Sequence, residues 1–137
     1  MNNTAPLFRI FSELDQVRIT RLAKRHTGPG QPVPRALEAM DEGDCVSPRD
    51  IPTDVITVNS RFVLQDKTGD TKVLTLCYPE QADFAQGFIS VMSPIGGELL
   101  GRRVGDTVQW TANDGKTAAY RIDTLAFQPE ASGDYAL

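Results

Sequence analysis

The chain has 137 residues and a net charge of −4, with 14 basic and 18 acidic side chains, 40% hydrophobic residues and 23% charged residues. This composition is ordinary for a small globular protein, and it argues against general affinity for nucleic acid, which depends on a basic surface. No apolar run has the length of a membrane span, and residues 1–6 lack the pattern of a secretion signal. We therefore expect a cytoplasmic protein without membrane contact and without sequence-specific binding of nucleic acid.

Metal ligands and nucleophiles are scarce. A structural zinc site needs about four close-spaced Cys or His ligands, but the chain has only Cys45, Cys77 and His26. We expect no metal, no cofactor and no catalytic group. A disulfide between the two cysteines stays open, although a buried thiol at Cys77 and an unremarkable one at Cys45 fit a cytoplasmic protein better. We expect His26 to be an exposed cation at a helix end.

The first third of the chain predicts two short helices that form an antiparallel hairpin. Ser12 is suited to cap a first helix that runs to about His26, and the Gly- and Pro-rich residues 27–32 end it. A second helix then begins at Pro34 and ends near Gly43. The prolines of residues 45–52 indicate a linker, so we expect a hairpin domain over residues 1–46 and a second domain over residues 47–137.

Two charge clusters lie in this hairpin. The basic one comprises Arg18, Arg21, Lys24 and Arg25, and the acidic one comprises Glu38, Asp41, Glu42 and Asp44. Charge runs of this kind are usually solvated helical faces. The basic cluster is large enough to contact one phosphate group.

The rest of the chain has the alternation and turn signals of strands. The expected strands span residues 55–64, 72–78, 107–111 and 117–127, and Asn113-Asp114-Gly115 is a hairpin signal between the last two. Residues 80–86 are expected to form a polar loop. The class is therefore α+β, with an antiparallel sheet of four or five strands and one short helix. The tail, residues 128–137, is expected to pack back on the domain or to be loose.

The segment from Ile89 to Asp106 is the most informative one. A short strand leads into Ser93-Pro94, where Ser can cap a helix and Pro suits its first position, and Gly101 can end that helix in the left-handed conformation. This segment resembles the C-terminal domain of the bacterial Gre transcript cleavage factors. The chain resembles the small Gre-like proteins of this family more closely still. That resemblance covers residues 54–61, 75–79, 90–96 and 128–137.

The resemblance implies an FKBP-like fold for the second domain and a short coiled coil for the first. Gre factors deliver a metal ion with carboxylates at the tip of a long coiled coil. Here the helices are short and the tip, residues 27–32, has no acidic residue. The four acidic residues of the second helix lie toward its far end. We therefore expect a protein that does not stimulate transcript cleavage.

In Gre factors an Asp-Ser-Pro step binds the rim of the RNA polymerase secondary channel. The matching residues here are Met92, Ser93 and Pro94, followed by Ile95, so Met replaces the acid. The resemblance implies a monomeric, non-catalytic transcription regulator that binds this rim and competes with Gre factors, with Glu38, Asp41, Glu42 and Asp44 as possible further contacts.

Three alternatives remain at this stage. From the residues alone, Ser93-Pro94 is better explained as a plain helix cap, and only the resemblance favours a binding role. The protein could instead be an interaction module for another partner. It could also be a prolyl isomerase, whose site would be an apolar aromatic pocket; we expect Trp110, the one tryptophan, to belong to the core instead.

Overall fold

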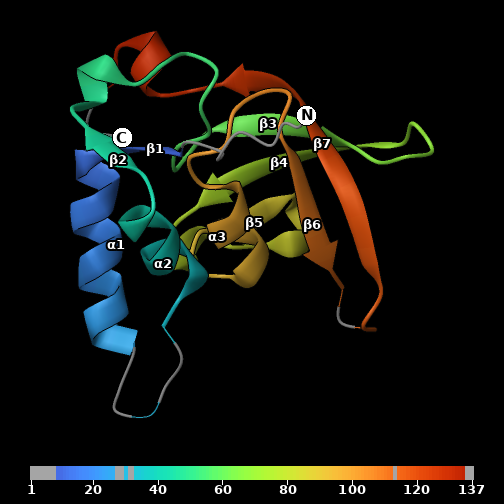
Figure 1. Cartoon of the computed structure of the whole chain (residues 1–137), viewed down its shortest axis with the longest axis horizontal. Coiled ribbons are helices and arrows are strands. Elements are labelled where there is room, and N and C mark those ends of the chain that lie inside the picture. Colours follow the sequence, from blue (N-terminus) through green and yellow to red (C-terminus); the bar gives the residue numbers. More distant parts are fainter. Residues whose placement is uncertain (1–8, 27–29, 31–32, 113, 135–137) are drawn as a thin grey trace.

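The computed structural model describes residues 9–26, 30, 33–112 and 114–134, and it places helices beside a curled five-stranded sheet (Figure 1). The α+β class is therefore confirmed. The helices are α1 (Glu13–His26), α2 (Arg35–Asp41) and α3 (Pro94–Leu99). The strands are β1 (Ile10–Ser12), β2 (Asp44–Val46), β3 (Arg61–Gln65), β4 (Thr71–Cys77), β5 (Phe88–Ser90), β6 (Thr107–Thr111) and β7 (Thr117–Phe127).

Helix α1 begins where the sequence predicts. The Ser12 hydroxyl oxygen accepts hydrogen bonds from the backbone N–H groups of Leu14 (3.1 Å) and Asp15 (3.4 Å). Two acidic residues in the first turn favour the positive end of the helix. Helix α2 has seven residues and follows Pro34. The predicted tip lies outside the described residues except for Gly30, as does the side chain of His26.

The segment predicted as the linker begins as a strand instead. Strand β2 pairs in parallel with β1, so that Phe11 lies opposite Cys45 and Ser12 opposite Val46. This pairing joins residues far apart in the chain, and no local sequence signal reports it. A short 3₁₀ turn, Pro48–Asp50, follows. The boundary between residues 46 and 47 stays a prediction.

The main sheet has the strand order β5-β4-β3-β7-β6. All pairs are antiparallel except β4 and β5, which run parallel. The predicted number of strands is confirmed, but the all-antiparallel arrangement is wrong at this edge. The reason is the connection between β4 and β5, which contains two 3₁₀ turns, Pro79–Gln81 and Phe84–Gln86. This connection brings the chain back to the end of the sheet at which β4 began, so β5 runs in the same direction as β4.

The predicted strand over residues 55–64 is also shorter than expected. Only Arg61–Gln65 pairs as a strand, because the N–H of Ser60 bonds the carbonyl of Thr57 (3.0 Å) in a turn. Asn59 in this turn has a φ of 74°, in the left-handed region. The alternation expected before the strand is absent, since Thr57 is buried together with Ile56 and Val58.

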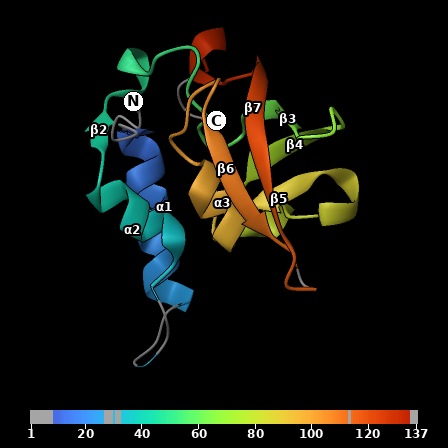
Figure 2. The same ribbon diagram turned by 45° about the vertical axis from the view of Figure 1, so that its right-hand side comes forward.

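The three helices stand on one side of the sheet, and α3 lies between the other two and the strands (Figures 1 and 2). The buried core contains side chains from helices and sheet together, among them Ile19, Phe62, Leu76, Leu99 and Ile122. In the described part of the chain, no helix is both long enough and apolar enough to cross a membrane. Cys45 and Cys77 are both free, and Cys77 is buried as expected.

The tail contacts the domain through Gln128 and Glu130, whereas residues 131–134 are exposed. The Gln128 side chain donates hydrogen bonds to the carbonyls of Pro52 (2.8 Å) and Val55 (2.6 Å). The Thr57 hydroxyl donates to a carboxylate oxygen of Glu130 (2.7 Å). Residues 135–137 lie outside the described part.

Candidate protein-binding site

The predicted strand, cap and helix unit is present around Ser93. The Ser93 hydroxyl accepts a hydrogen bond from the Gly96 N–H (3.1 Å) and donates one to the carbonyl of Ser90 (2.6 Å). Pro94 is the first helical residue of α3. Gly101, just after the helix, has a φ of 81°, a conformation that a residue with a Cβ rarely adopts. The cap interpretation is thus confirmed, and Pro94 is exposed to solvent.

Two glycines let α3 pack unusually close to its neighbours. A Cβ on Gly96 would collide with the backbone of Ser90 in β5. A Cβ on Gly97 would lie 2.5 Å from the backbone nitrogen of Ala36 and 2.7 Å from the Cβ of Arg35. The Gly-Gly pair therefore serves close packing: it places α3 directly between β5 and α2, and it fixes the position of the Ser93 turn.

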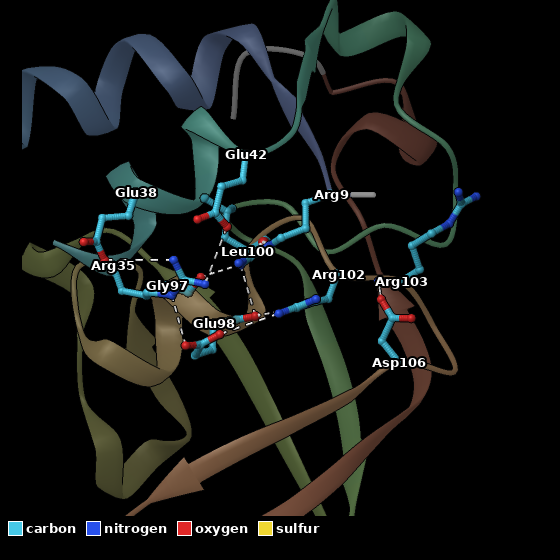
Figure 3. A network of polar contacts seen from close by, with 10 residues as sticks. All are labelled: Arg9, Arg35, Glu38, Glu42, Gly97, Glu98, Leu100, Arg102, Arg103 and Asp106. Atoms are coloured by element: carbon cyan, nitrogen blue, oxygen red, sulfur yellow. Dashed lines mark hydrogen bonds and ion pairs between the residues drawn. The ribbon is translucent and has the colours of Figure 1, made fainter. Parts of the chain in front are cut away.

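A buried arginine holds the other end of α3. The Arg9 guanidinium, 3% exposed, donates hydrogen bonds to the carbonyls of Gly97, Glu98 and Leu100 (Figure 3). Helix ends leave such carbonyls without partners within the helix. Burial, followed by the charges of Arg102 and Arg35, lowers the pKa of Arg9 to about 10, so it remains a cation at neutral pH.

Ion pairs join α2 to the same end of α3. Arg35 donates to the carboxylate of Glu98 at 3.0 Å, and Arg102 lies 3.6 Å from the other oxygen of that carboxylate (Figure 3). The hydrogen bond to Glu98 raises the pKa of Arg35. Because of these ion pairs and the close backbone approach at Gly97, helices α2 and α3 form one packed unit.

A groove opens beside the Ser93 turn, and we call it the aromatic groove. Its volume is about 840 Å³. Its walls come from α3, β5, the turn before β5 and the strands β6 and β7; its apolar lining includes Phe84, Phe88, Ile89, Ile95, Trp110 and Tyr120. Because the sheet curls, its two edge strands, β5 and β6, both line the aromatic groove.

The aromatic side chains in this groove contact one another. The rings of Phe84 and Trp110 meet edge to face with centroids 5.8 Å apart, and Trp110 and Tyr120 lie 5.7 Å apart. Phe84 is nevertheless 67% exposed. A large aromatic side chain that is held in place yet open to solvent is typical of binding surfaces.

The four predicted contact residues lie together but differ in exposure. Ser93 and Ile95 line the aromatic groove, although Ile95 is only 8% exposed. Pro94 is exposed, and Met92 is half-buried against the core. Trp110 departs in part from its expected core position, because it packs on the edge of the core and also lines the groove.

The four predicted acidic residues do not form a single site. Glu38 and Glu42 each lie 3.9 Å from the guanidinium of Arg35, whereas Asp41 and Asp44 are exposed. Within the described ranges, no group of three side chains is arranged to hold a metal ion.

A buried carboxyl ties α1 to residues that flank the strands β3 and β4. Asp15 is 3% exposed and accepts hydrogen bonds from the N–H of Val58 (3.1 Å) and the hydroxyl of Tyr78 (3.1 Å). Burial raises the pKa of Asp15 to about 6 against the lowering effect of these hydrogen bonds, and the Glu130 charge adds to the rise. Burial also raises the pKa of Tyr78.

Sequence reasoning missed Arg9, Asp15 and the wall of the groove formed by Phe84 and Tyr120. Phe84 offered a signal, since a large aromatic residue in an otherwise polar loop needs a reason to be exposed. Nothing in the local sequence marks Arg9, because its partners are carbonyls about ninety positions away.

Comparison with known proteins agrees with this architecture. Residues 51–125 match the family model described as transcription elongation factor, GreA/GreB, C-terminal. The chain is 38% identical over 130 residues to the regulator of nucleoside diphosphate kinase of Escherichia coli K12, covering 93% of this chain and 96% of that protein. It is 43% identical over 61 residues to the transcription elongation factor GreA of Nitratidesulfovibrio vulgaris, covering 44% of this chain and 38% of that protein.

A solved structure extends the likeness to the whole fold. The prokaryotic transcription elongation factor GreA/GreB from Nitrosomonas europaea superposes with a TM-score of 0.72 at 30% identity, covering 88% of this chain and 98% of that one. The relatives carry the names of regulators or factors. The chain therefore belongs to the GreA/GreB family of transcription elongation factors.

Proposed function

We propose that this protein regulates transcription by binding RNA polymerase at the rim of its secondary channel, without being an enzyme. The observation that carries the proposal is the Ser93-Pro94 turn standing at the edge of the aromatic groove. The matching turn of Gre factors, an Asp-Ser-Pro step, binds this rim, and the resemblance implies the same role for Ser93-Pro94. Membership of the family supports a role in transcription.

The groove has the chemistry of a protein-binding surface. Its apolar floor and exposed Phe84 suit apolar side chains presented by a partner helix, and Lys72, Lys116 and Asp114 supply polar groups around it. Such interfaces depend on a few aromatic anchors that become buried on binding. Met92 in place of an acid makes the contact beside the turn apolar rather than ionic.

The short length of helices α1 and α2 supports the proposal of a regulator without catalytic function. Helix α1 has 14 residues and α2 seven. At about 1.5 Å per residue, α1 is about 21 Å long. Glu38 on α2 and Glu42 just after it are paired with Arg35. We propose that the segment of α1 and α2 occupies the channel entrance, with Glu38, Asp41, Glu42 and Asp44 as possible contacts, and that the monomer competes there with Gre factors.

A binding assay with core RNA polymerase tests the proposal. Phe84→Ala removes an exposed anchor with little expected effect on stability, and Pro94→Ala alters the turn. We expect each change to weaken binding at least tenfold, which corresponds to about 1.4 kcal/mol. Val73→Ala is the matched control: Val73 is 58% exposed, and it faces away from the groove because its neighbour Lys72 lines it.

Equal binding by Phe84→Ala and the wild type would contradict the groove as the contact surface. Competition is tested separately by adding a Gre factor to the complex, and simultaneous binding of both factors to one polymerase would rule out a shared rim. In arrested transcription complexes we expect no stimulated cleavage, and Asp41→Ala with Glu42→Ala should leave that result unchanged.

The aromatic lining also keeps a second candidate, prolyl isomerase activity, open to test. An apolar pocket with Trp110 and Tyr120 is the kind of surface on which a proline ring could bind. Turnover of a proline-containing peptide that is lost in Trp110→Ala would favour this candidate. A third candidate, binding of another protein partner, would be favoured if the polymerase assay fails while the groove variants lose a different co-purifying protein.

A further inference from the structure

A second cavity, separate from the aromatic groove, lies between helix α1 and the end of strand β4, and we call it the arginine pocket. Its volume is about 320 Å³, within the range of small-ligand sites. Its lining is strongly basic and consists of Arg18, Arg21, Leu22, Arg25, Tyr78 and Glu80.

The helical period brings the three arginines together. Arg18, Arg21 and Arg25 are spaced by three and four positions, so they form one stripe along α1. Arg18 lies over the ring of Tyr78, with its guanidinium carbon 5.8 Å from the ring centroid. The first guanidinium of the stripe therefore packs on Tyr78, the residue that follows β4.

The other two arginines of the stripe, Arg21 and Arg25, lie further along α1. Among the residues that the structure describes, neither Arg21 nor Arg25 forms an ion pair, and both are exposed. Like charges at this spacing repel one another by a few tenths of a kcal/mol per pair. The lining contains three guanidiniums and one acid, Glu80, so it carries a net positive charge within an acidic protein. The buried Asp15, which accepts from Tyr78, interacts with the charge of Arg18 but does not line the pocket.

We propose that the arginine pocket binds a small ligand with two or more linked phosphates, such as the diphosphate of a nucleotide. Guanidinium groups bind phosphate oxygens in pairs, and three of them can share a diphosphate. Glu80 can accept hydrogen bonds from the hydroxyl or amino groups of a nucleoside. A long nucleic acid fits less well, because the protein as a whole has a net charge of −4 and nucleic-acid affinity depends on a basic surface.

The test is titration calorimetry of the full-length protein at low salt with inorganic phosphate, inorganic pyrophosphate and ADP. We expect pyrophosphate to bind at least tenfold more tightly than phosphate. Arg21→Gln with Arg25→Gln should weaken pyrophosphate binding at least tenfold, and thermal melting of the free variant checks that it is folded. Lys24→Gln is the matched control: Lys24 lies between the two arginines on α1 but does not line the pocket, so binding should change less than twofold.

The arms separate the possible sources of the phosphates. ADP binding more tightly than pyrophosphate, with the gain lost in Glu80→Gln, would assign the pocket to nucleotides. Equal binding would assign it to the phosphates alone. The proposal is overturned if none of the three ligands binds at millimolar concentration, if Lys24→Gln weakens binding as much as the double variant, or if only a single-stranded oligonucleotide binds.

Discussion

Asp15 is the ionisable group whose titration should change the stability of this fold most clearly. Burial raises its pKa from an ordinary 3.8 to about 6. Each pKa unit corresponds to about 1.4 kcal/mol, so the difference is worth about 3 kcal/mol. Because the folded pKa is the higher one, this stabilisation is fully present below pH 4 and is lost as the pH rises through 6.

Asp15→Asn removes the titration while keeping an oxygen that can accept from Val58 and an amide that can donate to the Tyr78 hydroxyl. We expect the free energy of unfolding of the variant, relative to wild type, to increase by about 2.5 kcal/mol between pH 4 and pH 7.5. Asp15→Ala leaves two buried donors without an acceptor, so it should be less stable than Asp15→Asn by about 2 kcal/mol at every pH.

The assay is urea unfolding followed by circular dichroism at pH 4, 5, 6 and 7.5 for the three proteins. Taking the difference between wild type and Asp15→Asn removes the contribution of all other carboxyl groups. A difference that is constant over this pH range would refute a raised pKa at Asp15. An Asp15→Ala protein as stable as Asp15→Asn would refute the role of its two hydrogen bonds.

Three further outcomes follow from the packing around α3 and from the two thiols. Arg9→Lys keeps the positive charge but loses the paired hydrogen bonds to the carbonyl of Leu100 at the end of α3. Urea unfolding should show a free energy of unfolding lower by about 2 kcal/mol, and a decrease below about 0.5 kcal/mol would contradict this role. Gly97→Ala forces α2 away from α3 and should cost about 1–3 kcal/mol, whereas its neighbour Glu98→Ala loses partly exposed ion pairs and should cost less than about 1 kcal/mol. In alkylation followed by mass spectrometry, Cys45 should react slowly in the native protein because burial raises its pKa, and the buried Cys77 only after unfolding; equal rates would contradict the burial of Cys77.

Features that depend on contacts between residues close in the chain were predictable, and features that depend on contacts between distant residues were missed. The Ser12 cap and the Ser93 turn were predictable because each depends on hydrogen bonds within three residues. The hairpin of β6 and β7 was predictable for the same reason, although Asn113 in its turn lies outside the described residues. The strand over residues 55–64 was predicted too long because its apolar residues suggest a strand, whereas residues 55–58 are all buried without pairing as one.

The sequence by itself determined the family, the α+β class, the position of the Ser93 turn and the absence of acidic residues from residues 27–32. These follow from local patterns, capping chemistry and identity along the chain. Only the tertiary structure decided that β2 pairs with β1, that Arg9 holds the end of α3, and that Phe84, Trp110 and Tyr120 share one groove. The physical reason is that these contacts join residues distant in the chain, and their geometry comes from the curl of the sheet and the close packing of α3, which no local pattern encodes.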